Sequence, residues 1–229
     1  MSTVIIALTS HDGDGRLGRP TGAWLEELAT PYWAFLDAGH DVVLASVAGG
    51  APPVDAASLA PEAITADVRR FQADPDADAA LHATIRLADV HVEADAIFLV
   101  GGHGTMWDFP HHQPLTDLVE RIAKTGIVGA VCHGPAGLLS ARVDDAPLLT
   151  GRTVAAFSDA EEALVGAAGA VPFSLQQQVG ACGATYTAGA PFQPHAVRDG
   201  NLVTGQNPAS SAACAALIVA ALREPALAS

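Results

Sequence analysis

The residues best suited to chemistry lie at 130–134, which read Ala-Val-Cys-His-Gly. One small residue stands two before Cys132 and another two after it, behind an apolar stretch and ahead of an expected helix start at 134–140. This pattern is typical of a nucleophile elbow, a turn so sharp that larger side chains would collide. Such a turn would expose the thiol above a sheet, and the helix N-terminus would lower its pKa. A buried Cys that only packs before a helix is the alternative interpretation.

His133 follows the candidate nucleophile directly. Its imidazole could take a proton from the thiol or move one on a substrate, provided that a carboxylate orients it. The candidate carboxylates lie just after the next expected strand, at Asp159, Glu161 and Glu162. A solvated acidic first turn of a helix explains Asp159 and at least one of the two glutamates equally well.

Two further segments could complete a site around Cys132. Gly101 and Gly102 follow another expected strand, and the Gly102 and His133 amides could together form an oxyanion hole. A plain tight turn is the simpler interpretation of this glycine pair. Glu26 and Glu27 open the first expected helix, where acidic side chains suit the helix dipole. One of them could instead lean over Cys132.

The remaining histidines indicate no metal centre. His111 and His112 are adjacent and cannot both face one ion from a regular helix or strand, and His82, His91 and His103 lack a ligand spacing of a known type. We therefore assign no metal and leave open a His/Glu site near the segment 49–89. Cys182 and Cys214 are expected to serve in packing.

Alternating elements must position these residues. Short apolar runs predict strands, and apolar positions at helical spacing predict helices. The expected strands lie at 4–8, 41–46, 96–100, 127–131 and 153–157, with a hairpin at 195–198 and 201–204. The expected helices lie at 26–38, ended by Gly39, and at 115–123, 159–165 and 209–222. The order predicts an α/β fold, a doubly wound, mostly parallel sheet with helices on both faces and ligands near the carboxyl ends of its strands.

The segment 49–89 breaks this alternation. It contains several prolines, many Ala and Asp residues, and no strand signal. It is too long for a simple connection, so we expect a small helical insertion that could act as a lid. A disordered surface loop is the alternative. The whole chain, 1–229, is expected to form one domain.

The composition narrows the class of protein. Half of the 229 residues are hydrophobic, 16% are charged, and the net charge is −14. Such an acidic chain is unsuited to nucleic acid or to anionic membranes and favours a small-molecule substrate. Three cysteines do not form a disulfide framework, residues 1–8 lack the features of a signal peptide, and no apolar run reaches the length of a membrane span. We expect a soluble, cytoplasmic protein.

These residues together resemble the ThiJ/PfpI superfamily of glutamine-amidotransferase-like α/β proteins. Within it, the chain is similar to the branch of heat-shock-type chaperones and glutathione-independent glyoxalases (glyoxalase III). The resemblance extends over nearly the whole chain. It is carried by Thr21-Gly22 with Glu27 and Pro31, by 101–104 (Gly-Gly-His-Gly), by 131–136 (Val-Cys-His-Gly-Pro-Ala), by 157–159 with Glu162, and by 204–210 (Thr-Gly-Gln-Asn-Pro-Ala-Ser).

The resemblance implies a flavodoxin-like sheet, no cofactor and a homodimer. It implies that Cys132 is the nucleophile, that His133 is its partner, and that Glu162 is the triad carboxylate, although neighbouring Glu161 could shift this assignment by one. Glu27 matches an acid whose protonated carboxyl bonds the thiolate. The oxyanion donors would be the amides of Gly102, next to Gly101, and of His133.

The implied activity is the cofactor-independent conversion of 2-oxoaldehydes such as methylglyoxal and glyoxal to 2-hydroxy acids, a lyase reaction of the D-lactate dehydratase type. Two alternatives remain. One is a cysteine hydrolase or hydratase of amide-like or nitrile-like substrates. The other is a stress-responsive chaperone or redox sensor. The chaperone interpretation is weakened because the chain is shorter than the large chaperones of this branch.

Overall fold

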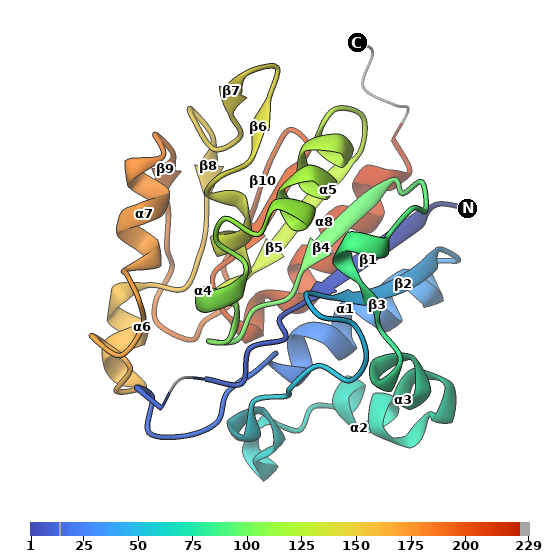
Figure 1. The fold of residues 1–229 in the computed structure, drawn as a ribbon, viewed down its shortest axis with the longest axis horizontal. Coiled ribbons are helices and arrows are strands. Elements are labelled where there is room, and N and C mark those ends of the chain that lie inside the picture. The colour runs from blue at the N-terminus through green and yellow to red at the C-terminus, as the bar shows by residue number, and fades with distance from the viewer. Residues whose placement is uncertain (14, 225–229) are drawn as a thin grey trace.

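A seven-stranded sheet runs through the centre of the protein (Figure 1). The computed structural model describes residues 1–13 and 15–224, so residues 14 and 225–229 of the expected 1–229 domain lie outside the described residues. The strand order is β10-β11-β5-β4-β1-β2-β3, and every pair is parallel except β10 with β11. The bounds are β1 (Thr3–Leu8), β2 (Asp41–Ser46), β3 (Ile85–Arg86), β4 (Ala96–Leu99), β5 (Ile127–Val131), β10 (Ala196–Asp199) and β11 (Leu202–Gly205).

Helices cover both faces of this sheet, as predicted for a doubly wound fold. Successive side chains of a strand point to opposite faces, and the buried residues accordingly fall into two clusters. Val4 and Ile6 of β1 face α1 (Leu25–Asp37) and α8 (Ser211–Leu222), whereas Ile5 faces α5 (Gln113–Ala123). The expected α/β fold class is confirmed.

The end of α1 shows why the chain turns directly into β2. Gly39 adopts φ of 84°, a left-handed conformation in which a glycine carries little steric penalty. Its N–H donates to Leu36 at 2.9 Å, and the His40 N–H donates to Phe35 at 3.0 Å. These two bonds form the Schellman motif, which satisfies the last carbonyls of the helix.

The segment 49–89 holds more regular structure than the sequence predicts. Its elements are η1 (Ala56–Leu59), η2 (Pro61–Ala63), α2 (Ala66–Ala73), α3 (Pro75–His82), β3 and η3 (Leu87–Asp89). The expectation of no strand here is wrong, because β3 pairs with the end of β2. Two residues are too few for the alternation that marks a strand in sequence, and Ile85 is 42% exposed.

A buried carboxylate joins this segment to the N-terminal part of the chain. Asp55 is fully buried and accepts hydrogen bonds from the Arg19 guanidinium at 2.5 Å, from Thr21 Oγ1 at 2.8 Å and from the Ala57 N–H at 2.9 Å. An ionised group is costly to bury unless it is paired and hydrogen-bonded, and Asp55 has both kinds of partner.

Two elements near the expected nucleophile differ from the predictions. The helix expected at 134–140 is a five-residue 3-10 helix, η4 (Gly134–Leu138). The strand expected at 153–157 shortens to β8 (Thr153–Val154), which pairs with β9 (Thr185–Tyr186) outside the main sheet. After β8 the backbone no longer pairs with β9. Instead, the Phe157 N–H donates to the Cys132 carbonyl at 2.9 Å.

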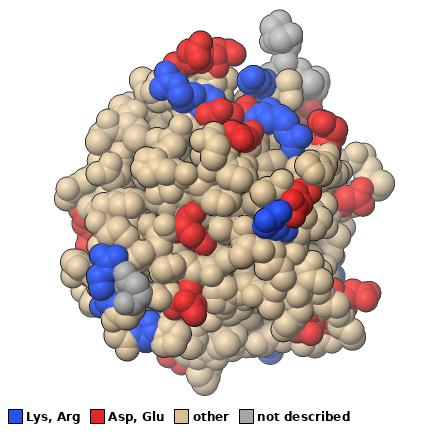
Figure 2. Space-filling model, viewed as in Figure 1, with Lys and Arg blue, Asp and Glu red and all other residues tan. Residues whose placement is uncertain are grey.

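The remaining elements are short. They are α4 (Thr105–Asp108), β6 (Arg142–Val143), β7 (Ala146–Pro147), α6 (Asp159–Leu164), α7 (Leu175–Ala181) and η5 (Pro208–Ser210). None of the helices in the described part of the chain has the length and apolar character needed to cross a membrane. On the face seen in Figure 2, basic side chains are few and many of them adjoin acidic ones, so this face shows no broad basic patch of the kind that nucleic acid binds.

Candidate active site

Cys132 lies in a strained turn at the carboxyl end of β5. Its φ is 59°, which is uncommon for a residue with a side chain and is typical of a nucleophile elbow. The turn is fixed by the Cys132 N–H, which donates to Gly205 of the neighbouring strand β11 at 2.9 Å. A Cβ at Gly134 would lie 2.3 Å from the Leu99 carbonyl oxygen, so only glycine fits there. The steric pattern predicted for 130–134 therefore matches the geometry.

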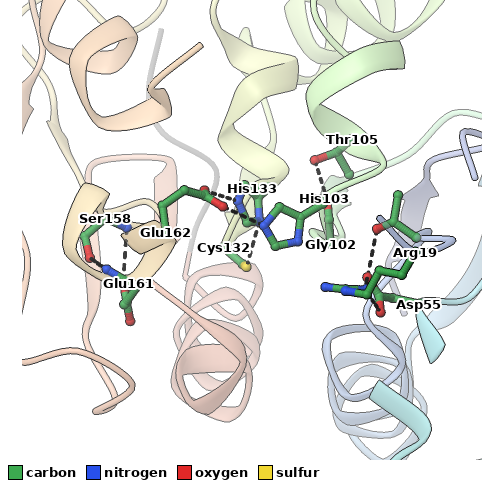
Figure 3. Close-up of polar contacts among 11 residues, drawn as sticks. Arg19, Asp55, Gly102, His103, Thr105, Cys132, His133, Ser158, Glu161 and Glu162 are labelled. Carbon is green, nitrogen blue, oxygen red and sulfur yellow. Dashed lines mark hydrogen bonds and ion pairs between the residues drawn. The ribbon is translucent and has the colours of Figure 1, made fainter. Parts of the chain in front are cut away.

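Cys132, His133 and Glu162 form a continuous line of contacts (Figure 3). The Cys132 sulfur lies 3.3 Å from His133 Nδ1, and His133 Nε2 lies 2.9 Å from Glu162 Oε2. All three residues are buried. The strained turn thus brings two adjacent side chains together, and α6 contributes the carboxylate that orients the imidazole.

His103 is a residue of this site that the sequence reasoning missed. Its Nε2 lies 2.6 Å from Glu162 Oε1, and its ring centroid is 4.3 Å from that of His133. The Glu162 carboxylate therefore bonds two neighbouring imidazoles, one through each oxygen (Figure 3). His103 follows Gly101 and Gly102 after β4, which is the neighbour of β5. That adjacency was the signal that could have identified it.

The charges of this group follow from its hydrogen bonds. Burial raises the pKa of Glu162, but the hydrogen bonds from His103 and His133 outweigh burial and bring this pKa to about 2. Burial lowers the pKa of His133, and the neighbouring His103 lowers it further. At neutral pH His133 is therefore an uncharged imidazole. It donates its Nε2 proton to ionised Glu162 and presents the Nδ1 lone pair to the thiol.

Glu161 has a different set of partners, although it precedes Glu162 directly. It is fully buried, and its carboxylate accepts five hydrogen bonds, from the backbone N–H and hydroxyl of Ser158, from Gln206, from Asn207 and from the Phe192 N–H. With Ser158 it forms the capping box of α6. Figure 3 shows Glu161 turned toward Ser158. Of the two glutamates, Glu162 is the one that contacts the imidazoles.

Glu27 of α1 is a second carboxyl group near the thiol. It is fully buried, and its Oε2 accepts the Gly101 N–H at 2.8 Å. Its Oε1 is buried without a hydrogen-bond partner among the described residues, and the Cys132 side chain lies close enough to lower the pKa of this carboxyl. Burial dominates and raises the pKa of Glu27 well above 4.5. Glu27 is therefore protonated over a wide pH range, with Oε1 as a suitable donor toward the sulfur.

The thiol itself is not activated in the way that the sequence predicts. Burial raises the pKa of Cys132, and the charged form of Glu27 raises it further. The low pKa expected at this turn is wrong, because burial of the thiol outweighs the stabilisation that nearby amides give to its charged form. Hydrogen bonds from the Gly102 and His133 amides do lower this pKa. Ionised Glu27 therefore opposes a thiolate at Cys132, and protonation of Glu27 removes that part of the opposition.

The two amides expected to form an oxyanion hole converge on the sulfur. Gly102 has φ of 101°, and a Cβ there would lie 2.2 Å from the Gly22 carbonyl oxygen, so position 102 requires glycine. A Cβ at Gly101 would lie 2.6 Å from Glu27 Oε2. These close approaches fix the backbone at 101–102, whose Gly102 N–H interacts with the Cys132 sulfur.

A cavity of about 340 Å³ opens at Cys132 and His133. Its walls away from the thiol are mostly apolar, and they include Trp24, Ala57, Phe157, Val165, Phe192 and Pro208. The sequence predicted the reactive end of this cavity but none of these wall residues.

One group of residues has donors suited to a metal ion. One ligand atom each from His103, His133 and Glu162 lie within 4.8 Å of one another. Two imidazoles and a carboxylate suit ions such as zinc. The same atoms already satisfy one another by hydrogen bonds, which accounts for their proximity without an ion.

Comparisons with known proteins agree with this geometry. The DJ-1/PfpI family description matches residues 21–221. A glutathione-independent glyoxalase of Saccharomyces cerevisiae is 32% identical over 96% of this chain and 98% of its own length. The crystal structure of glyoxalase III from Candida albicans has a TM-score of 0.87 at 28% identity and covers 96% of this chain and 97% of its own. Rapid Encystment Protein 24 kDa from Francisella tularensis has a TM-score of 0.93 at 36% identity, covering 98% of this chain and 100% of its own.

Proposed function

The chain belongs to the DJ-1/PfpI family, and on that premise we propose that it is a lyase that converts 2-oxoaldehydes to 2-hydroxy acids without glutathione. Methylglyoxal would yield lactate. The observation that carries the proposal is the line of contacts from the Cys132 thiol through His133 to Glu162 at the floor of a cavity. Relatives that match nearly the whole chain bear the name of glutathione-independent glyoxalase, which supports the choice of reaction.

In the first step the Cys132 sulfur attacks the aldehyde carbon. His133 Nδ1, which lies 3.3 Å away, accepts the thiol proton, and a carbon–sulfur bond forms. The former aldehyde oxygen becomes the oxyanion of a hemithioacetal. The Gly102 and His133 amides, which converge on the sulfur, donate to this oxygen.

In the second step a proton moves between the two substrate carbons. A base removes the hydrogen from the carbon that carries sulfur, giving an enediol, and the neighbouring carbon is protonated. The former aldehyde carbon is thereby oxidised to a thioester, and the former ketone carbon is reduced to an alcohol. The electrons stay within the substrate, so no external oxidant or reductant takes part. His133 first returns the thiol proton to the substrate oxygen and is then a neutral base, oriented by Glu162, that is suited to carry the carbon-bound proton.

In the last step water attacks the thioester, the carbon–sulfur bond breaks, and the 2-hydroxy acid leaves. The departing sulfur recovers a proton. Protonated Glu27, whose Oε1 is buried beside Cys132, would stabilise the thiolate by donating a hydrogen bond. The triad of the proposed enzyme is therefore Cys132, His133 and Glu162, with Glu27 as an auxiliary acid.

The experiment that tests this function is an NMR time course of the purified protein with methylglyoxal and no glutathione. Lactate should accumulate well above the rate in buffer, and the Cys132→Ala variant should form none above that rate. Cys214→Ala is the matched control, since Cys214 is also buried but lies in α8. Appreciable turnover by Cys132→Ala would contradict the mechanism. Absence of lactate with the intact protein would contradict the substrate class.

A further inference from the structure

The cavity is larger and more apolar than a molecule as small as methylglyoxal requires. Its volume of about 340 Å³ corresponds to roughly eleven water molecules and falls within the range of pockets that enclose drug-sized ligands. Arg19, a basic residue of its lining, is held by the buried Asp55 carboxylate at 2.5 Å. A charged substituent on the substrate would therefore find the Arg19 charge already paired.

Aromatic rings form part of the wall between the reactive end and the opening. Phe157 lies against His133 with ring centroids 4.5 Å apart, and Phe192 lies 6.3 Å beyond Phe157. The Phe192 side chain is 42% exposed. It is thus an aromatic surface that is only half covered and that borders the cavity.

The backbone of Phe192 is held in a costly conformation. Its φ is 58°, a region that favours glycine and asparagine and is unfavourable for a bulky side chain. Such strain persists only where the surrounding structure fixes it, and it concentrates at functional sites. Here the Phe192 N–H donates to the buried Glu161 carboxylate at 2.8 Å, and Asn207 bonds both Glu161 at 2.8 Å and the Gln193 carbonyl at 2.9 Å.

Glu161 therefore links the loop that carries Phe192 to the helix that carries Glu162. Gln206 strengthens this link, because it accepts the Gly189 N–H at 2.7 Å and donates to Glu161 at 2.9 Å. The side chain that forms the outer wall is positioned by the residue adjacent to the carboxylate of the reactive end.

We propose that Phe192 is a specificity-determining residue and that the cavity selects 2-oxoaldehydes whose ketone carbon bears a flat apolar group, such as an aryl ring. This inference rests on the proposed function, in which Cys132 attacks the aldehyde carbon. With that carbon at the sulfur, the substituent of the ketone carbon extends toward Phe157 and Phe192, where ring–ring contact favours an aryl group.

The test uses 2-chloroketones, which share the ketone-plus-terminal-carbon skeleton and do not need turnover. The Cys132 thiolate displaces chloride and forms a stable carbon–sulfur bond. The rates of labelling by phenacyl chloride and by chloroacetone are measured by mass spectrometry of the Cys132 peptide, and each is divided by its rate with N-acetylcysteine. We expect the normalised ratio to favour the aryl reagent by on the order of tenfold in the intact protein.

Three variants decide the role of the ring. Phe192→Gly removes the ring and retains the left-handed backbone, so it should reduce the preference by about fivefold, the value of an aromatic contact. Phe192→Tyr should retain the preference. Leu164→Ala truncates another exposed apolar side chain, 66% exposed and not part of the cavity wall, and should leave the preference unchanged.

Either of two results would overturn the inference: a normalised ratio near one in the intact protein, or a preference that survives Phe192→Gly. Turnover of phenylglyoxal and methylglyoxal is measured in parallel to separate this inference from the proposed function. A labelling preference without turnover of either substrate would overturn the glyoxalase function while leaving the aryl selection of the cavity supported. Turnover of both substrates without any labelling preference would support the glyoxalase function and overturn the aryl selection of the cavity.

Discussion

The His103 imidazole donates a 2.6 Å hydrogen bond to Oε1 of Glu162, while His133 bonds the other oxygen of the same carboxylate. Two donors on one buried carboxylate explain why the pKa of Glu162 is lowered to about 2 despite its burial. His103 therefore acts through Glu162 on the orientation of His133, as a positioning residue.

Replacing His103 with Phe should keep a ring beside His133 and remove the hydrogen bond. We expect kcat to fall by roughly 10- to 100-fold, because a bond to a charged group contributes about 1.5–3 kcal/mol. The pKa of Glu162 should rise, so the loss of activity on acidification should begin at a higher pH than in the intact protein. The pH profile of kcat tests this, with His91→Phe as the exposed control. Superimposable profiles would refute a role for His103 through Glu162.

Glu162→Gln should affect mainly kcat, whereas Glu161→Gln should affect mainly the free energy of unfolding. Glu162→Gln replaces an acceptor with an amide beside two imidazole donors, and we expect kcat to fall by on the order of ten-thousandfold. Glu161→Gln disturbs five hydrogen bonds and should lower the free energy of unfolding by about 2 kcal/mol, while methylglyoxal turnover is largely retained at low temperature. Urea unfolding and kcat are measured for both variants. Equal effects on both quantities would show that the two carboxylates act as one unit.

Glu27→Gln should remove a pH dependence of stability. Since burial raises the pKa of Glu27 well above 4.5, the folded protein holds a proton that the unfolded chain releases above that pH. The contribution of Glu27 to stability is thus complete below about pH 4.5 and declines as the pH rises toward the folded pKa. In that window the variant should show a slope less negative by about 1.4 kcal/mol per pH unit. Urea unfolding between pH 5 and pH 8 measures it, and parallel curves would contradict a protonated Glu27.

Gly102→Ala should disable the site through a steric overlap. The added Cβ would lie 2.2 Å from the Gly22 carbonyl, so the backbone must shift and the amide must leave the sulfur. Loss of one oxyanion donor lowers kcat by on the order of a hundredfold. Gly151→Ala is the matched control, because Gly151 has φ of 75° and open space around its Cβ position. If both variants lose activity equally, general backbone strain rather than the Gly102 amide is responsible.

The large elements were predictable because their signals are local. The apolar runs of β1 and β5 are fully or almost fully buried, and α1 ends at a glycine that forms a Schellman motif. By contrast, β3 has two paired residues and β8 pairs with a segment about 30 residues later, so neither has a periodicity to detect. The small elements depend on tertiary pairing rather than on their own sequence.

The site residues divide in the same way, into those with a local sequence signal and those brought together only by the fold. Cys132 and His133 form a local motif, and the structure brings them together. His103 reaches Glu162 across 59 positions of sequence, and it can do so because β4, which precedes His103, lies beside β5, which precedes His133. Glu161 and Glu162 are adjacent on a helix and differ by about 100° in direction, so they reach different partners. A motif comparison that can slip by one position does not decide which of them faces the imidazoles. The spacing Ser158-x-x-Glu161 is a capping-box signature and could have assigned Glu161 to the helix start.

The two margins of the sheet restrict how copies of this chain can associate. At one margin β3 pairs through only two residues, and at the other the Thr153 N–H donates to Asp199 of β10 at 2.8 Å, which places residues 152–153 against that strand. Long bare strand edges are the usual templates for cross-molecule sheet growth and fibril formation. With short and covered margins, the central sheet offers little template for such growth, so the folded protein should withstand high concentration without forming β-aggregates through this sheet.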